Sequence, residues 1–208
     1  MKTREKIVNK ALELFNENGY NNITTRHVAK ELGMSAGNLH YHFKHTEDLI
    51  KYIFSDLKMK MDEMINQFKT TEYVSLDHLF NYTEVTFEIL YSYRFIFLNF
   101  VDILRKIPEI ESQYKELNIS RKSEFQLIFA EFQKNKIFRE NIPEFILDNL
   151  VTQIFIIGDN WMAYNSLTLK LDKKKAFQHY SIVFLNLFYP FLSYEQQKIY
   201  EKKYIKRP

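Results

Sequence analysis

The chain has 208 residues, of which 46% are apolar and 16% aromatic, and its formal net charge is +3. It contains four glycines, four prolines and no cysteine. This composition excludes a disulfide framework and a thiolate metal site, and the scarcity of glycine and proline favours long helices. The first residues, MKTREKIV, lack the apolar core of a signal peptide, so we expect a cytoplasmic protein.

The first predicted helix is amphipathic and ends at Gly19-Tyr20. Its apolar positions follow helical spacing and are Ile7, Val8, Ala11, Leu12 and Phe15. We expect this stripe to cover Val28, Leu39 and Phe43, which are the inward positions of the next two helices. The sequence therefore predicts a three-helix bundle at the N-terminus.

The run TTRHVAKELGMSAGNLHYHF, residues 24–43, predicts two short helices joined by a turn. Thr24 or Thr25 can cap the first helix, and Gly33 follows it where a left-handed residue is needed. Ser35 can cap the second helix. This is the layout of a helix-turn-helix that binds DNA. An ordinary helical hairpin with a solvated polar face is the alternative.

The second of these helices carries the residue types that a recognition helix needs. Ala36 and Gly37 are small enough to let the helix backbone enter the major groove. Asn38, Tyr41 and His42 can reach base edges, and Tyr41 can also contact a thymine methyl group. Thr25, His40 and Lys44 are the expected phosphate contacts. The full set of candidate DNA-binding residues is Thr25, Arg26, Ser35, Ala36, Gly37, Asn38, His40, Tyr41, His42, Lys44 and Thr46.

Through these motifs, residues 1–57 resemble the N-terminal DNA-binding domain of the TetR family of bacterial transcriptional regulators. The similarity runs through ALELFNENGYNNITTRHVAKELGMS and continues in AGNLHYHFKHTEDLI. The usual first tyrosine of the family is His40 here, and its phosphate-binding lysine is Thr46. Since a fixed positive charge is lost at Thr46, we expect weaker or more pH-sensitive DNA binding, which Lys44 and Lys51 offset in part.

A fourth helix from Glu47 has apolar residues at helical spacing and is long enough to leave the N-terminal bundle. We therefore expect two domains, a helix-turn-helix DNA-binding domain at 1–57 and a helical effector-binding and dimerisation domain at 58–208. The fourth helix is the expected rigid connection, because no low-complexity linker is visible. The fold class is all-α, and the further predicted helices lie at about 76–93, 95–105, 109–136, 143–167, 174–191 and 194–204.

The helices that follow Pro143 and Lys173 are apolar on more than one side. A helix that is apolar all round is buried all round, and a second copy of the chain can supply the second surface. In the TetR family the last two long helices of each subunit form the dimer interface, and the resemblance implies the same here. The expected interface residues are Ile146, Leu150, Ile154, Ile157, Phe177, Tyr180, Phe184 and Leu187. The alternative is that both helices are central within one monomer.

Aromatic residues are frequent in the second domain, and polar residues embedded in its apolar runs are candidate ligand contacts. The candidate pocket residues are Tyr91, Phe95, Asn99, Asp102, Phe129, Asn160, Trp161 and Tyr164. We expect a mainly apolar, flat ligand, with an acid group if Arg94 or Arg105 faces inward. Alternatively, the embedded polar groups pair with backbone, with these arginines or across the dimer.

Other classes of function lack their motifs. The sequence has no phosphate-binding glycine loop, no HExxH and no nucleophile elbow, so we expect no catalysis and no cofactor. Of His27, His40, His42 and His45, only the last two have the spacing of metal ligands on a helix, and no metal site is expected. Residues 176–194 carry no formal charge, but their embedded polar groups and proline favour a buried helix over a membrane span.

We therefore expect a sequence-specific transcriptional regulator. The expected partners are double-stranded DNA with a palindromic operator, a second copy of the chain and an unknown small-molecule effector, with no membrane. Repression is favoured because the first domain has no evident surface for recruiting polymerase. The alternatives are an effector-free architectural or cell-cycle DNA-binding dimer, and an activator.

Overall fold

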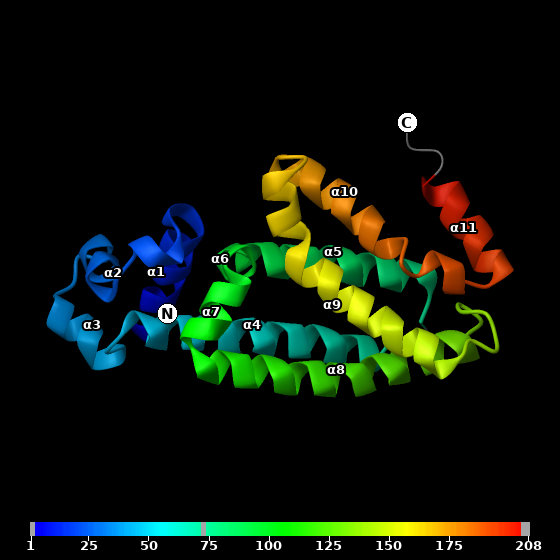
Figure 1. The fold of residues 1–208 in the computed structure, drawn as a ribbon, viewed down its shortest axis with the longest axis horizontal. Helices are drawn as coiled ribbons and strands as arrows, with labels where there is room; N and C mark the ends of the chain where they lie inside the picture. The colour runs from blue at the N-terminus through cyan, green and yellow to red at the C-terminus, as the bar shows by residue number, and fades with distance from the viewer. Residues whose placement is uncertain (1–2, 72–73, 205–208) are drawn as a thin grey trace. The chain divides into compact units, whose positions relative to one another are not determined.

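A computed structural model describes residues 3–71 and 74–204, and these residues form helices without an extended strand (Figure 1). The elements are α1 (Thr3–Asn18), η1 (Tyr20–Asn22), α2 (Thr25–Glu31), α3 (Ala36–His42), α4 (Thr46–Lys69), α5 (Leu76–Ser92), α6 (Arg94–Leu98), α7 (Phe100–Lys106), α8 (Pro108–Lys134), α9 (Glu144–Leu167), α10 (Lys173–Leu185), η2 (Tyr189–Phe191) and α11 (Tyr194–Tyr204). An isolated antiparallel bridge joins Phe138 to Leu192. The prediction of an all-α fold with an N-terminal helix-turn-helix is confirmed.

Two predicted helices differ from the structure. The helix expected at 95–105 is divided at Asn99, whose side-chain amide donates to the carbonyl oxygen of Phe95 (2.8 Å), so that α6 and α7 are separate. The helix expected at 174–191 ends at Leu185, and the chain turns before η2. The uncharged run from residue 176 is thus not one helix. Within 3–71 and 74–204, no helix combines the length and apolar character that a membrane crossing requires.

Contacts divide the chain into two compact units. The first contains the residues up to Asp62 together with Ile89–Tyr114, and the second contains Glu63–Glu88 together with the residues from Lys115 onward. Three long helices, α4, α5 and α8, each have residues in both units. The sequence position 57, where we expect the domain boundary, lies inside α4.

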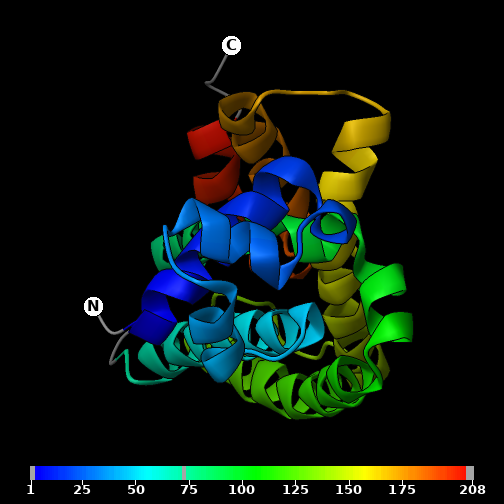
Figure 2. The ribbon, with the colours of Figure 1, turned by 90° about the vertical axis from the view of Figure 1, so that its left-hand side faces the viewer.

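The core of the first unit follows from the apolar periodicity of its helices. Residues at spacings of three or four share one helix face, so each short helix contributes a few side chains to a common interior. Those with no exposed surface include Ile7, Ala11, Val28, Leu39, Leu49 and Ile53. Burying each large apolar side chain contributes about 1.5–3 kcal/mol to the stability of the folded state. This burial stabilises α2 and α3, which are short helices (blue in Figure 2).

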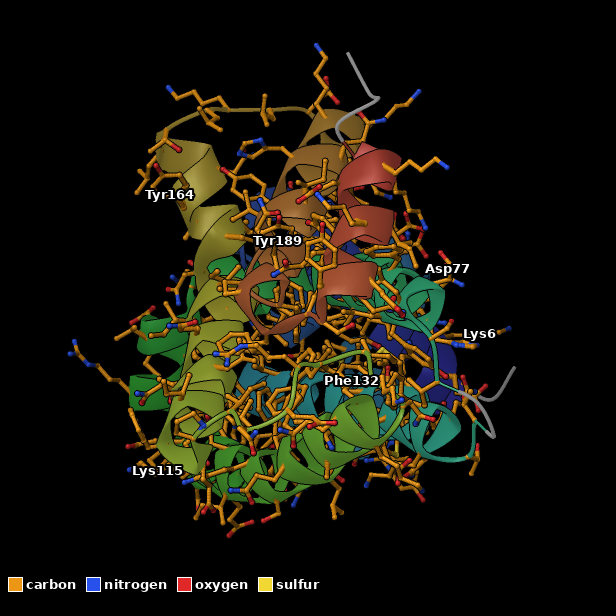
Figure 3. The ribbon with its side chains drawn as sticks, turned by 90° about the vertical axis from the view of Figure 1, so that its right-hand side faces the viewer. Lys6, Asp77, Lys115, Phe132, Tyr164 and Tyr189 are labelled. Carbon is orange, nitrogen blue, oxygen red and sulfur yellow. The ribbon has the colours of Figure 1, made fainter. Side chains whose placement is uncertain are left out.

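The second unit has an aromatic core. Phe132, labelled in Figure 3, packs against Phe138, with ring centroids 5.0 Å apart, and Phe138 packs in turn on Phe188. A second group forms where Phe87 of α5 lies 5.1 Å from the ring of Trp161 of α9. Helices α9 and α10 lie side by side as an antiparallel hairpin that closes this core (Figure 1).

Candidate nucleic-acid interface

Helices α2 and α3 each begin at a capping residue. Thr24 is the N-cap of α2, and its backbone N–H donates to Nδ1 of His27 (3.2 Å). The N–H of Asn38 donates to the Ser35 hydroxyl oxygen at the start of α3 (3.2 Å). Histidine at the third helical position thus performs the role that Glu or Gln has in a capping box. The cap gives His27 a structural role that spacing alone did not predict.

The turn between the two helices depends on Gly33. This residue has φ 65°, in the left-handed region that side chains rarely adopt. Its N–H donates to Lys30 O (3.0 Å), and the N–H of Met34 donates to Ala29 O (3.0 Å). Together these two bonds form a Schellman motif, which ends α2 and redirects the chain into α3.

Helix α3 has one buried face and one exposed face. Leu39 and Phe43 are buried in the first unit. The side chain of Tyr41 is 86% exposed, and its ring meets the edge of the His42 ring with centroids 5.3 Å apart. A Cβ built on Gly37 would have no heavy atom within 4 Å. Of the predicted base-contacting residues, Asn38 and Tyr41 are exposed and His42 is half-buried, while the small residues Ala36 and Gly37 and the predicted phosphate contact His40 are also exposed.

The remaining predicted DNA contacts surround α3. Arg26 on α2, Ser35 and Lys44 are exposed, whereas Thr25 and Thr46 are half-buried at the first positions of α2 and α4. Side chains at the start of a helix lie next to its free backbone N–H groups, which favour an anion such as phosphate.

Lys51, which we expected to offset part of the charge lost at Thr46, forms ion pairs with two carboxylates of the first unit. Its ammonium group pairs with Asp48 (3.3 Å) and Glu109 (3.5 Å). The backbone N–H of His45 also donates to Asp48 (3.0 Å). Partial burial opposes ionisation of the Asp48 carboxyl, but this N–H and Lys51 hold its pKa below the ordinary value. The ionised carboxylate thereby stabilises the start of α4.

Sequence reasoning missed a set of contacts that joins α1 to the turn between α5 and α6. The side-chain amide of Asn16 donates to Ser92 O (2.8 Å), and its oxygen accepts from the Phe95 N–H (3.1 Å). The rings of Phe15 and Phe95 lie 5.0 Å apart beside this amide. Phe95, a predicted pocket residue, is thus buried against α1. The polar Asn16 within an amphipathic helix was the available signal.

The same turn also contacts α4 through Tyr93. Its hydroxyl donates to the Asp56 carboxylate (2.5 Å) and accepts from the Lys60 ammonium (2.5 Å). Tyr93 is fully buried, and this burial, together with the neighbouring Asp56, raises the pKa of its hydroxyl. The turn therefore holds both α1 and α4, the helices that flank the helix-turn-helix.

Asp102, which we predicted in the ligand pocket, is exposed and pairs within the first unit. It accepts from the Tyr20 hydroxyl and forms an ion pair with Lys106 (3.1 Å). Lys106 also donates to Asn21 (3.1 Å). The hydroxyl of Tyr20 and then Lys106 hold the pKa of Asp102 below its ordinary value. These bonds follow from the proximity of α7 to η1, which the sequence did not reveal.

The other predicted pocket residues are divided between the units. In the first unit, Tyr91 is half-buried, with the Arg94 guanidinium 5.0 Å from the centroid of its ring, and Asn99 donates to backbone. In the second unit, Phe129 and Trp161 are buried in aromatic groups. Two further residues of the second unit are exposed, namely Asn160, which donates to Ile156 O (2.9 Å), and Tyr164.

Half of the predicted dimer residues face the interior of the monomer. The buried ones are Leu150, Ile154, Tyr180 and Phe184. The half-buried ones are Ile146, Ile157, Phe177 and Leu187. The buried side chains are unavailable to a second copy, because they already pack on the chain's own core, as Phe184 does on Phe87 with centroids 5.7 Å apart. Hydropathy could not tell which of two apolar faces of α9 turns inward.

Comparison with known proteins agrees with this geometry. Residues 7–53 match the model described as bacterial regulatory proteins of the tetR family, and residues 57–200 match one described as a bacterial transcriptional repressor, TetR. The chain is 31% identical over 137 residues to the HTH-type transcriptional regulator QacR of Staphylococcus aureus, covering 65% of this chain and 73% of that protein. It is also 26% identical over 160 residues to the regulator SAB2452 of the same species, covering 74% and 81%.

A solved structure extends the similarity to the full length. A TetR-family transcriptional regulator from Marinobacter aquaeolei superposes with a TM-score of 0.86 and 30% identity, covering 100% of both chains. The similarity thus includes α3 as well as the helical part that follows it.

Proposed function

Because the chain belongs to the TetR family of bacterial transcriptional regulators, we propose that it is a repressor that binds a palindromic operator as a homodimer. A small, mainly apolar ligand binds the second domain and releases the protein from DNA. The protein acts in the cytoplasm and performs no catalysis. In this proposal the two domains meet near residue 57, inside α4.

The observation that carries this proposal is the exposed face of α3. Tyr41 extends into solvent, and open space lies over Gly37, while the opposite face of the helix is buried. A small residue lets the backbone approach the groove, and the side chains beyond it can then reach base edges. No acidic residue occurs between Gly33 and Thr46, so no carboxylate there repels phosphate.

The homodimer gives this short helix its specificity. One helix-turn-helix contacts only a few base pairs, whereas a two-fold pair contacts two half-sites about 34–36 Å apart, or a multiple of that distance. A ligand that changes this spacing by several ångströms prevents both helices from reaching their half-sites. DNA release then requires only that the ligand binds more tightly to the form of the dimer with the altered spacing.

We propose the aromatic group around Trp161 as the ligand contact. The rings of Phe87 and Tyr180 lie 5.1 and 5.3 Å from the Trp161 ring, and Phe129 lies in the neighbouring group. Such surroundings favour a flat, apolar ligand. Trp161 is the single tryptophan of the chain, so its fluorescence reports on ligands that bind there.

An effector-free architectural DNA-binding dimer is the second candidate. It is favoured by the internal pairing of three polar groups that we expected to contact a ligand. Asn99 and Asn160 donate to backbone carbonyls, and Asp102 pairs with Tyr20. Groups that are already paired gain little from a ligand.

The test is a selection of binding sites from random duplex DNA at two salt concentrations, with the mass of the protein in solution recorded. A palindromic site bound by a dimer supports the proposal and supplies the operator for ligand screening by Trp161 fluorescence. Non-specific binding that disappears with salt favours the architectural role. Failure to bind any DNA, with and without a screened ligand, contradicts both.

A further inference from the structure

Arg4, in the first turn of α1, contacts two aromatic rings of the first unit. Its guanidinium carbon lies 5.1 Å from the ring centroid of Phe43 and 4.6 Å from that of Tyr52. Phe43 directly follows the last residue of α3, and Tyr52 lies on α4. The two rings pack edge to face, with centroids 5.8 Å apart. Arg4 therefore joins α1 to the end of the proposed recognition helix and to α4.

The position of Arg4 on α1 accounts for these contacts. Residues three or four apart share one face of a helix, so Arg4 lies on the same face as Ile7 and Val8, which are buried. Arg4 itself is exposed, because it lies beyond these residues and reaches over the rings. Lys6 lies about 200° around the helix from Arg4, and Figure 3 shows its side chain extending into solvent. The two exposed cations of this turn thus occupy different sides of α1.

The aromatic contacts leave Arg4 able to bind an anion. A guanidinium is planar and stacks on a ring through its face, so the N–H groups along its edge remain available as donors. Arg4 forms no ion pair with any carboxylate that the structure describes, whereas Lys51 of the same unit pairs with Asp48 and Glu109. The rings also restrict the arginine side chain before a ligand arrives, which lowers the entropy cost of binding.

The surroundings of Arg4 favour a DNA phosphate as this anion. Phe43 directly precedes Lys44, which is exposed and is one of the phosphate contacts that we propose. Phe43 also ends the helix whose exposed face we propose to enter the major groove. Phosphates line both edges of that groove, so a cation next to the end of α3 is well placed to meet one.

We propose that Arg4 binds a phosphate of the operator through the edge of its guanidinium, while Phe43 and Tyr52 hold it in place. This inference deepens the proposed function and rests on it, because α3 has to enter the groove for the phosphate to come within reach. Arg4 supplies a fixed positive charge next to α4, whose first residue, Thr46, carries none. A phosphate contact carries no sequence information, so Arg4 contributes equally to operator and random DNA.

The test is equilibrium binding of the full chain to the selected operator and to random duplex DNA at several salt concentrations. Arg4→Gln removes the charge, and we expect about tenfold weaker binding to both DNAs and a salt slope lower by about one. The matched control is Lys6→Gln, which removes a charge from another side of α1 and changes affinity by less than about twofold. Tyr52→Leu removes one ring and weakens binding less than Arg4→Gln. It adds no further loss in the double variant, because the ring acts through the arginine.

Helicity by circular dichroism is expected to stay the same in all of these variants. If Arg4→Gln binds DNA as tightly as the natural chain, this inference is overturned and the proposed function stands. A loss of affinity with an unchanged salt slope means that the arginine only packs helices together, and a loss restricted to the operator means that it contacts base edges. Both results overturn the phosphate contact. A natural chain that binds neither DNA overturns the proposed function as well.

Discussion

The side-chain oxygen of Asn16 in α1 accepts a hydrogen bond from the backbone N–H of Phe95 at the start of α6, at 3.1 Å. The amide nitrogen of Asn16 binds the last residue of α5 at the same time, and Tyr93, between these two sites, reaches α4. One short turn is therefore bonded to both helices that flank the helix-turn-helix. A displacement of this turn acts on α1 and α4 together.

Replacing Asn16 with alanine removes its hydrogen bonds to the Ser92 carbonyl and the Phe95 N–H. We expect Asn16→Ala to lower the free energy of unfolding by about 1–3 kcal/mol, measured by urea denaturation. The control is Asn18→Ala, because the side-chain amide of Asn18 donates to the carbonyl oxygen of Leu14 within α1, at 3.3 Å. Equal losses in the two variants would show that the amide of Asn16 adds nothing to the attachment of α1.

Replacing Gly37 with alanine separates folding from DNA binding. A Cβ at this position meets no atom of the protein, and alanine favours a helix more than glycine, so Gly37→Ala raises or preserves the melting temperature. The added methyl group obstructs the approach of α3 to the groove, and operator binding weakens by about 1–3 kcal/mol. A variant that binds the operator as tightly as the natural chain would exclude close approach at Gly37.

Tyr41 and Lys44 are expected to differ in the kind of contact that they make. Tyr41→Ala costs about 1–3 kcal/mol and relaxes base preference, whereas Lys44→Ala weakens all DNA about equally and lowers the salt slope by about one. Binding isotherms on operator and random DNA at several salt concentrations distinguish the two. The division of roles fails if both variants lose sequence preference to the same extent.

Substitutions of His27 test its role in the cap of α2. Gln keeps a side-chain acceptor at the third helical position, so His27→Gln retains stability, and His27→Leu loses about 0.5–1 kcal/mol. The Thr24 N–H, which donates to Nδ1 of His27 at 3.2 Å, keeps an acceptor in His27→Gln and loses it in His27→Leu. Thermal melting of the three proteins provides the comparison, and equal melting temperatures for His27→Gln and His27→Leu would contradict the role of the imidazole as an acceptor.

The raised pKa of the Tyr93 hydroxyl predicts that the folded protein loses stability in alkali. Burial and Asp56 raise its pKa above the ordinary value of 10.0, so above about pH 10 the unfolded chain releases this proton and the folded chain retains it. The folded state is therefore disfavoured as pH rises, by up to about 1.4 kcal/mol per pH unit from this group. Urea denaturation across this range should show a smaller slope for Tyr93→Phe, and parallel slopes would argue against a buried, neutral hydroxyl.

The sequence by itself determined the features that depend on neighbouring residues. Helical spacing predicted α1 and the helix-turn-helix, and the cap at Ser35 and the left-handed turn at Gly33 lie where they were predicted. The last helix begins and ends at the predicted residues, Tyr194 and Tyr204. Propensity, capping and turn geometry act within a few residues, so one sequence window contains the necessary information.

Only the tertiary structure decided which side of each helix is buried in the core. Helix α9 is apolar on more than one side in sequence, and in the structure Leu150 and Ile154 are buried, whereas Phe145 and Ile156 are exposed. The bond between Asn16 and Phe95 joins residues 79 positions apart. Which helix face is buried depends on contacts between segments that are distant in sequence. Because the hydrophobic effect is non-directional, two similar apolar faces differ only in the residues that pack against them.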